Sequence, residues 1–190
     1  MVFQWERSII ISWICQLIIG CCLLTSCQSS PPKYPSIEIS RVISGQMVEW
    51  IDKSQQPPVI QQGRLAGIEA PDRGQEPWGD QAKQRLIDSI GKSSKDTLTV
   101  ELDTVAPDNF GRSFLYLWKD GELLNEKLVR EGYVLASMPN PNYPSTAPHG
   151  TKYRERFIRG SQYARLMGQG IWNPDRPMRM TPAEFRKEAR

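Results

Sequence analysis

Cysteine and histidine are distributed so unevenly along this sequence that they limit what its folded part can contain. All four cysteines lie near the N-terminus, at Cys15, Cys21, Cys22 and Cys27. A disulfide framework or a cysteine-based zinc site is therefore excluded after Cys27. The single histidine, His149, excludes a metal site with two histidine ligands and argues against Ser-His-Asp catalysis. Any metal must then be bound by oxygen, which favours a hard cation such as calcium.

The first 26 residues are predicted to be a secretory signal segment. An almost unbroken apolar run from Ile9 to Leu24 follows Arg7, and it is short for a membrane-spanning helix. The tetrad Leu24-Thr25-Ser26-Cys27 resembles a bacterial lipoprotein box, in which the cysteine is lipidated and becomes the mature N-terminus. The alternative is an uncleaved N-terminal anchor, and both interpretations export and tether the chain. Gln28 is not the aspartate that signals inner-membrane retention, which favours an outer membrane in a two-membrane bacterium.

The rest of the chain suits one domain. Residues 27–36 are polar and proline-rich and are predicted to be a tether, followed by a domain over 37–173 and a tail over 174–190. The formal net charge of +3 permits an anionic partner without requiring one. Nothing in the sequence implies a protein partner, so a monomer is expected.

Apolar alternation predicts five β-strands. They are a hairpin over 37–51 that turns at Ser44-Gly45, followed by strands over 59–68, 97–105 and 114–118. In the segment 97–105, the side chains of Leu98, Val100 and Leu102 are expected to point inward. A turn at Asp120-Gly121 is expected to close the last strand.

Helical periodicity predicts three helices, over 78–90, 125–130 and 153–167. Gly91 and Gly132 are expected to end the first two, and Asn125 is expected to cap the second. The residues expected to share one face of the third helix are Tyr153, Phe157, Gly160, Ala164 and Met167. Residues 138–151 are rich in Pro, Asn and Ser and predict a surface loop. Periodicity alone indicates no more than mixed α and β structure.

Charged residues stand beside turn-forming ones in two segments, Arg64-Leu65-Ala66-Gly67-Ile68-Glu69-Ala70-Pro71-Asp72 and Asp108-Asn109-Phe110-Gly111-Arg112. Two arginines and two carboxylates can hold a phosphate and a hard metal ion while water attacks phosphorus. Further along come Asp120-Gly121, Leu128-Val129-Arg130 and Gly170-Ile171-Trp172. In this order the motifs resemble the thermonuclease (staphylococcal nuclease-like) family, over about residues 41–172.

The resemblance implies an α+β domain, a five-stranded OB-fold-type β-barrel capped by about three helices. It implies that Arg64 contacts the scissile phosphate and that Arg112 stabilises the charge that builds on phosphorus and the leaving oxygen. Glu69 falls at the position of a calcium-binding aspartate. Asp72 falls at that of a glutamate that orients or deprotonates the attacking water. Calcium is the implied cofactor, and it would bridge and neutralise the phosphate.

Three positions depart from the family pattern. Gln46 stands where the family has a calcium-binding carboxylate, and its carbonyl can ligate calcium but brings no charge. Glu69 and Asp72 exchange the family's Asp and Glu, so the reach of each changes by one methylene, about 1.5 Å. Tyr143 lies where family tyrosines hold a second phosphate, but it is expected only to pack or lie exposed.

Three functions remain open at this point. The first is an exported, calcium-assisted phosphodiester hydrolase that cuts DNA or RNA with low sequence specificity, since such a site contacts the backbone. The second is a degenerate OB-fold that binds single-stranded nucleic acid or another anionic polymer without cutting it, which the neutral Gln46 favours. The third is a tethered protein-interaction domain that uses the loop over 138–150. Taken singly, Arg64, Arg112, Glu69 and Asp72 could each be ordinary surface charges.

Overall fold

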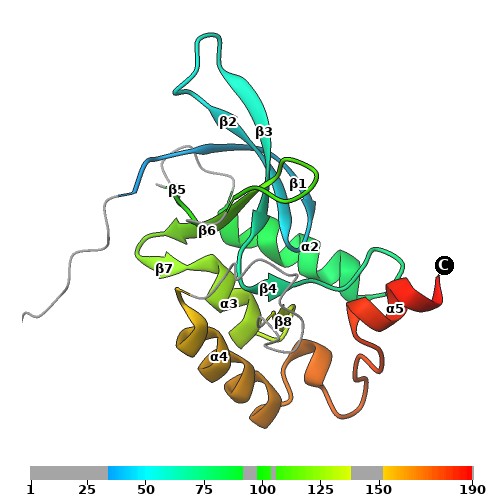
Figure 1. Cartoon of the computed structure of the whole chain (residues 1–190). Coiled ribbons are helices and arrows are strands. Elements are labelled where there is room, and N and C mark those ends of the chain that lie inside the picture. The colour runs from blue at the N-terminus through cyan, green and yellow to red at the C-terminus, as the bar shows by residue number, and fades with distance from the viewer. Residues whose placement is uncertain (1–33, 92–97, 104–105, 138–151, 190) are drawn as a thin grey trace, which may run out of the picture. The chain divides into compact units, whose positions relative to one another are not determined.

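The computed structural model describes residues 34–91, 98–103, 106–137 and 152–189, which belong to one compact unit over residues 33–190. The predicted signal segment, Cys27 and the whole predicted loop at 138–151, which includes Tyr143, lie outside the described residues. Within the described ranges, no helix is long and apolar enough to cross a membrane. Helices and a mixed sheet make up the unit, so the α+β prediction is confirmed (Figure 1).

The main sheet has six strands. Their order is β1 (Glu38–Ser44), β2 (Met47–Asp52), β3 (Val59–Leu65), β6 (Ser113–Lys119) and β5 (Leu98–Leu102), with β7 (Glu122–Leu123) beside β6. β3 and β6 run parallel, and the other neighbours are antiparallel. A second, two-stranded sheet pairs β4 (Ile68–Glu69) with β8 (Leu135–Ala136). The β2–β3 hairpin projects from the rest of the domain (Figure 1).

The predicted barrel is not a closed one. Among the described residues, the edge strands β1 and β5 form no ladder, and a single bridge joins Ser36 to Thr99 instead. Two backbone hydrogen bonds flank the bridge, from Ile37 N–H to Leu98 O at 3.0 Å and from Val100 N–H to Pro35 O at 2.9 Å. The register of β1 is irregular at two places, and such irregularities bend a strand and interrupt its pairing.

Four α-helices occur in the described part, rather than about three. They are α2 (Trp78–Ile90), α3 (Leu124–Arg130), α4 (Arg154–Leu166) and α5 (Pro182–Glu188), with a 3₁₀ turn at Gly170–Trp172. α2 has the predicted bounds and packs on β1, while α3 packs on α4 (Figure 1). α5 lies in the segment expected to be a tail, and sequence periodicity did not indicate it.

The core lies between the sheet and the helices, and its largest fully buried side chains include Leu65, Ile68, Leu86, Leu115 and Phe157. Two side chains that were predicted to face the core, Leu102 and Met167, do not. Leu102 is 53% exposed because it ends the edge strand β5, and Met167 is 53% exposed because it follows the last residue of α4.

Asn125 does not cap α3. The helix begins one residue earlier, and the Asn125 side chain is fully buried inside it. Its amide oxygen accepts from Leu117 N–H at 3.0 Å, and its amide nitrogen donates to Ala66 O at 2.9 Å and Leu115 O at 3.0 Å. A buried amide needs such partners, because an unpaired one would be costly in the core. Asn125 therefore joins β6 to the turn after β3.

The β1–β2 turn lies directly against α2. A Cβ atom added to Gly45 would lie 2.6 Å from the Cβ of Ala82, so only glycine permits this approach. The close contact fixes the next residue, Gln46, at the edge of the sheet near the loop that follows β4.

Candidate functional site

Arg64 lies within the sheet, on β3 between Met47 of β2 and Phe114 of β6. Its side chain is half-buried, and its Nε atom is buried with no hydrogen-bond partner among the described residues. Burial, and then the nearby charge of Arg112, lowers the pKa of Arg64. A guanidinium nevertheless stays protonated at neutral pH. A partly buried cation with an unpaired donor is suited to binding an anion.

Arg112 approaches the same place from the turn before β6. Its Nη1 lies 3.2 Å from the sulfur of Met47, the residue that pairs with Arg64. Asp108 orients the guanidinium, because its Oδ2 accepts from Arg112 Nε at 2.7 Å and lies 2.6 Å from Nη2. Gly111, at a φ of 75°, makes the tight turn that brings Asp108 and Arg112 together. The structure thus brings Arg64 and Arg112 to one site.

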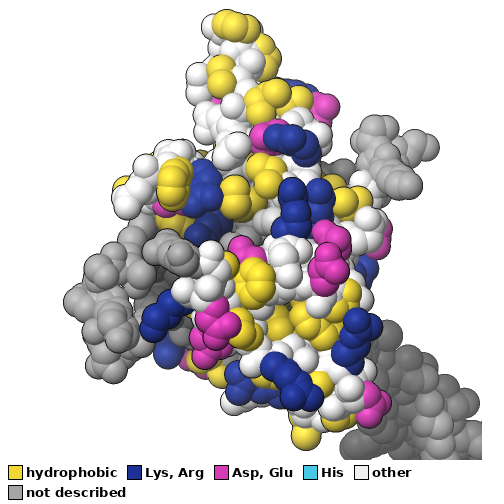
Figure 2. All heavy atoms as spheres, turned by 90° about the vertical axis from the view of Figure 1, so that its right-hand side faces the viewer, with side chains coloured by type: hydrophobic (Ala, Val, Ile, Leu, Met, Phe, Trp, Pro, Cys, Tyr) yellow, Lys and Arg dark blue, Asp and Glu magenta, His cyan; other side chains and the backbone are white. Residues whose placement is uncertain are grey.

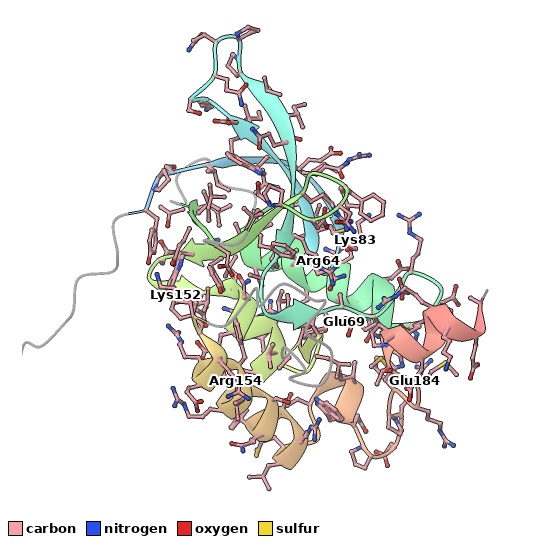
Figure 3. All side chains as sticks on the ribbon, in the orientation of Figure 1. Arg64, Glu69, Lys83, Lys152, Arg154 and Glu184 are labelled. Atoms are coloured by element: carbon pink, nitrogen blue, oxygen red, sulfur yellow. The ribbon has the colours of Figure 1, made fainter. Side chains whose placement is uncertain are left out.

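Glu69 and Asp72 lie on β4 and on the loop that follows it, and both pair with one arginine. Arg186 Nη1 donates to Asp72 Oδ2 at 2.7 Å, and Arg186 Nη2 donates to Glu69 Oε1. Glu69 also acts electrostatically on Arg64 and opposes the lowering of its pKa. Both predicted carboxylates therefore border the arginine site. Figure 3 shows Arg64 on β3 and Glu69 on β4.

The fit of these residues to a metal ion can be judged from their oxygen atoms. In the described ranges, no three His, Cys, Asp or Glu side chains gather closely enough to hold a metal ion. Gln46 Oε1 accepts from the Ala70 backbone N–H at 2.7 Å, beside the acidic loop. One guanidinium bridges Glu69 and Asp72, so the two carboxylates can share a single cation, and oxygen donors suit calcium. The pair fits a calcium ion provided that Arg186 moves away.

A pocket of about 200 Å³ adjoins this pair, and α2 forms one of its walls. The charged and polar side chains that line it are Ser44, Gln46, Asp72, Arg73, Asp80 and Lys83. The face of the molecule that carries α5 presents basic side chains beside acidic ones (Figure 2). The site is therefore mixed in charge rather than uniformly basic.

Sequence analysis did not identify Asp108, Gln75, Lys83 or Arg186 as part of the site. Asp108 opens the motif that ends at Arg112, so the spacing of a turn-forming aspartate and a glycine could have indicated its role. Arg186 had no such signal, because it lies 114 residues along the chain from Asp72. Only the packing of α5 brings it to the acidic pair.

Comparison with known proteins decides the family. The sequence profile described as "Staphylococcal nuclease homologue" matches residues 62–174, more than half of the 190 residues. This chain belongs to the staphylococcal nuclease homologue family. The match includes Arg64, Glu69, Asp72 and Arg112, and it ends before α5.

Individual proteins that are similar to this chain support the same family. The thermonuclease of Staphylococcus hyicus is 27% identical over 141 residues, which are 72% of this chain and 75% of that protein. The thermonuclease of Staphylococcus intermedius is 27% identical over 139 residues, covering 70% and 74%. An uncharacterized 38.1 kDa protein of Capnoides sempervirens is 30% identical over 130 residues, 67% of this chain and 32% of that protein. Membership in the family supports a hydrolytic, nuclease-type function.

Proposed function

We propose that this protein hydrolyses phosphodiester bonds of DNA or RNA with little sequence preference. The convergence of two arginines beside an acidic pair carries the proposal. Arg64 and Arg112 both lie against Met47, and Glu69 acts electrostatically on Arg64. A site of this kind contacts phosphate rather than base edges, which accounts for low specificity.

The two arginines have different tasks. Arg64, whose buried Nε is unpaired within the described ranges, grips the oxygens of the scissile phosphate. Asp108 pairs with the Nε and Nη2 atoms of Arg112. The remaining N–H donors of Arg112 stabilise the charge that develops on phosphorus and on the leaving oxygen. Asp108 holds Arg112 in place before substrate binds, so this guanidinium needs little reorganisation during the reaction.

Asp72 is the residue that orients or deprotonates the attacking water. Its backbone is fixed by the buried Gln75, whose Oε1 accepts from Asp72 N–H at 2.9 Å. Glu69 and Gln46 would hold calcium next to Asp72, and the ion when bound would neutralise charge on the phosphate. Gln46 lowers the negative charge available to the ion, so we expect weak binding.

The test is a cleavage assay on the full-length protein, purified in detergent. Denatured DNA and single-stranded RNA are incubated with the protein in calcium and in chelator. We expect cleavage in calcium, and we expect Arg112→Ala to reduce it at least about a hundredfold, as removal of a transition-state donor does in other enzymes. Arg154→Ala is the matched control, because Arg154 is an exposed arginine at the start of α4 (Figure 3). Equal losses in the two variants would contradict the proposal.

One observation favours a second function. Gln46 brings no charge and Arg186 offsets one of the two negative charges of the acidic pair, so the site could bind nucleic acid without cutting it. Such a protein would retain denatured DNA in both calcium and chelator, and its affinity would fall steeply with salt. Binding without products under every metal condition would replace the hydrolase proposal by this one.

We further propose that the domain is exported and anchored by a lipid on Cys27. The apolar run over 9–24 and the tetrad that ends in Cys27 support this proposal. Metabolic labelling with a tritiated fatty acid in a bacterial host should label the protein, and Cys27→Ser should abolish the label. A labelled Cys27→Ser variant would contradict lipidation at this residue, and an unlabelled but membrane-bound wild type would support the uncleaved anchor.

A further inference from the structure

Arg186 forms the contact on which the inference rests. Its guanidinium bridges the carboxylates of Glu69 and Asp72, and the three side chains are 43%, 20% and 35% exposed. Burial opposes the charge on Arg186, but the hydrogen bond to Glu69 and the charges of Asp72 and Glu69 outweigh burial and raise its pKa. The arginine is therefore a fixed positive charge on the acidic pair.

The helix that carries Arg186 is anchored to the loop that carries Asp72. Gln75 accepts from Asp72 N–H at 2.9 Å, and its Nε2 donates to Met180 O at 2.9 Å. Phe185 packs so closely on Gly74 that an added Cβ would lie 3.0 Å from its ring. Thr181 and Glu184 form a capping box that starts α5. Arg186 thus lies at the acidic pair because its helix is docked there.

The arginines and the carboxylates around Arg64 are equal in number without any bound ion. Three guanidinium groups, those of Arg64, Arg112 and Arg186, face three carboxylates, those of Asp108, Glu69 and Asp72. The charge of Arg186 also contributes to lowering the pKa of Arg64, so the two cations repel each other. A divalent cation added to this arrangement would meet a carboxylate pair that already faces the positive charges of Arg186 and Arg64.

We propose that Arg186 and a divalent cation are alternative occupants of the Glu69–Asp72 pair, so that α5 sets the calcium concentration at which the site loads. The inference rests on the proposed function, since it takes these carboxylates as the acidic groups of the nuclease site. Arg186 occupies Oδ2 of Asp72 and Oε1 of Glu69, so the guanidinium and a calcium ion compete for the same two carboxylates. Loading with calcium releases the Arg186 side chain and so removes one of the contacts that hold α5.

Calcium titration by isothermal calorimetry tests the proposal without any activity measurement. The full-length protein is compared with Arg186→Gln and with Lys187→Gln, a neighbouring exposed lysine that makes no ion pair within the described ranges. We expect Arg186→Gln to bind calcium about tenfold more tightly, because two partly exposed ion pairs no longer compete. Lys187→Gln should match the wild type. Affinities of Arg186→Gln and wild type within twofold of each other, or weaker binding by Arg186→Gln, would overturn the proposal.

A second variant separates competition from a general loss of charge. Phe185→Ala removes the contact with Gly74 but keeps Arg186, so it should also raise calcium affinity, though less than Arg186→Gln. In hydrogen exchange on the wild type, calcium should accelerate exchange over residues 181–189. Unchanged exchange at saturating calcium, together with a calcium affinity that Arg186→Gln leaves unchanged, would contradict the alternative occupancy.

Failure of this inference can be told apart from failure of the proposed function. If Arg112→Ala abolishes cleavage while Arg186→Gln leaves calcium affinity unchanged, the nuclease stands and the competition is wrong. If Arg186→Gln gains calcium affinity but neither protein cleaves DNA or RNA, the competition stands and the nuclease is wrong. Absence of calcium binding by all variants overturns the competition.

Discussion

The Asp108 side chain holds Arg112 through two hydrogen bonds and an ion pair, in a turn that begins at Asp108 and ends at Arg112. Asp108 Oδ2 accepts from Arg112 Nε at 2.7 Å, and Oδ1 accepts from the backbone N–H groups of Phe110 at 3.0 Å and Arg112 at 3.1 Å. Burial alone would raise the pKa of Asp108, but these hydrogen bonds from Arg112 and Phe110 outweigh burial and lower it. The carboxylate is therefore ionised at neutral pH, and the direction of the Arg112 guanidinium depends on it.

Asp108→Asn should lower nuclease activity by roughly tenfold to a hundredfold, because a misplacement of about 1 Å in a catalytic group can cost that much. Arg112 itself remains, so the loss should be smaller than in Arg112→Ala. The measurement is kcat/KM on denatured DNA, with the melting temperature recorded alongside. Asp175→Asn, a change at an exposed aspartate, is the control. Activity equal to wild type would mean that Asp108 does not orient Arg112.

Arg64→Met should abolish activity and yet stabilise the fold. Arg64 is half-buried, and its Nε is unpaired among the described residues, so the folded state carries a desolvation cost that methionine removes. We expect a gain of about 1 kcal/mol in the free energy of unfolding, in line with other replacements of buried charge. Urea unfolding measures it. A variant less stable than wild type would show that Arg64 has protein partners that offset its burial.

Gln46→Glu should strengthen calcium binding. Glutamate keeps the length that lets Gln46 accept from Ala70 N–H, and it adds the negative charge that the family pattern has at this position. Gln46→Leu is the matched variant, since it keeps the volume and removes the oxygen. Calorimetry should rank calcium affinity as Glu above Gln above Leu. If all three bind calcium equally, Gln46 is not a ligand of the ion.

Stability should fall in acid because of Glu101. This buried carboxylate accepts from Tyr153 Oη at 2.7 Å and from Trp118 Nε1 at 3.3 Å, and it pairs with Lys152. Burial alone would raise the pKa of Glu101, but the hydrogen bonds from Lys152 and Tyr153 outweigh burial and lower it below its usual 4.5. A lowered folded-state pKa stabilises the protein above about pH 4.5, and this stabilisation is lost as the pH falls through the folded-state pKa.

Glu101→Gln should therefore destabilise the protein by about 2 kcal/mol at pH 7, the size expected for hydrogen bonds to a charged group. The difference from wild type should shrink as the pH falls through the folded-state pKa of Glu101, because the wild-type carboxyl then becomes protonated. Urea midpoints at several pH values measure this. Glu38→Gln is the control, because its pair with Lys53 is exposed. A difference that stays constant from pH 7 to pH 3 would contradict the assignment.

Elements specified by local signals were predictable from the sequence. The hairpin that turns at Ser44-Gly45 and the helix Trp78–Ile90 occur where predicted, because a turn glycine and Gly91, at a φ of 81°, determine their ends. The arginines and carboxylates were found in the same way, since each lies on a motif of a few residues. The order of the motifs along the chain, which resembles that of the family, indicated that they come together in space. Periodicity did not.

Features that depend on distant partners were not predictable. Asn125 has the sequence signature of a cap, but its burial against Ala66, 59 residues away, determines its actual role. Closure of a barrel depends on the path of the chain before β1, which periodicity does not specify. Arg186 resembles any exposed helix arginine until α5 docks on Gly74 and Gln75.

The amide of Asn125 reaches the two chain segments that carry the arginines. It donates to Ala66, two residues after Arg64, and to Leu115, three residues after Arg112. Besides the parallel pairing of β3 with β6, a fully buried side chain thus ties together the segments that carry the two guanidinium groups. A substitution of Asn125 during evolution would change the spacing of Arg64 and Arg112, and with it the turnover of the proposed reaction, while every residue that lines the site stayed the same.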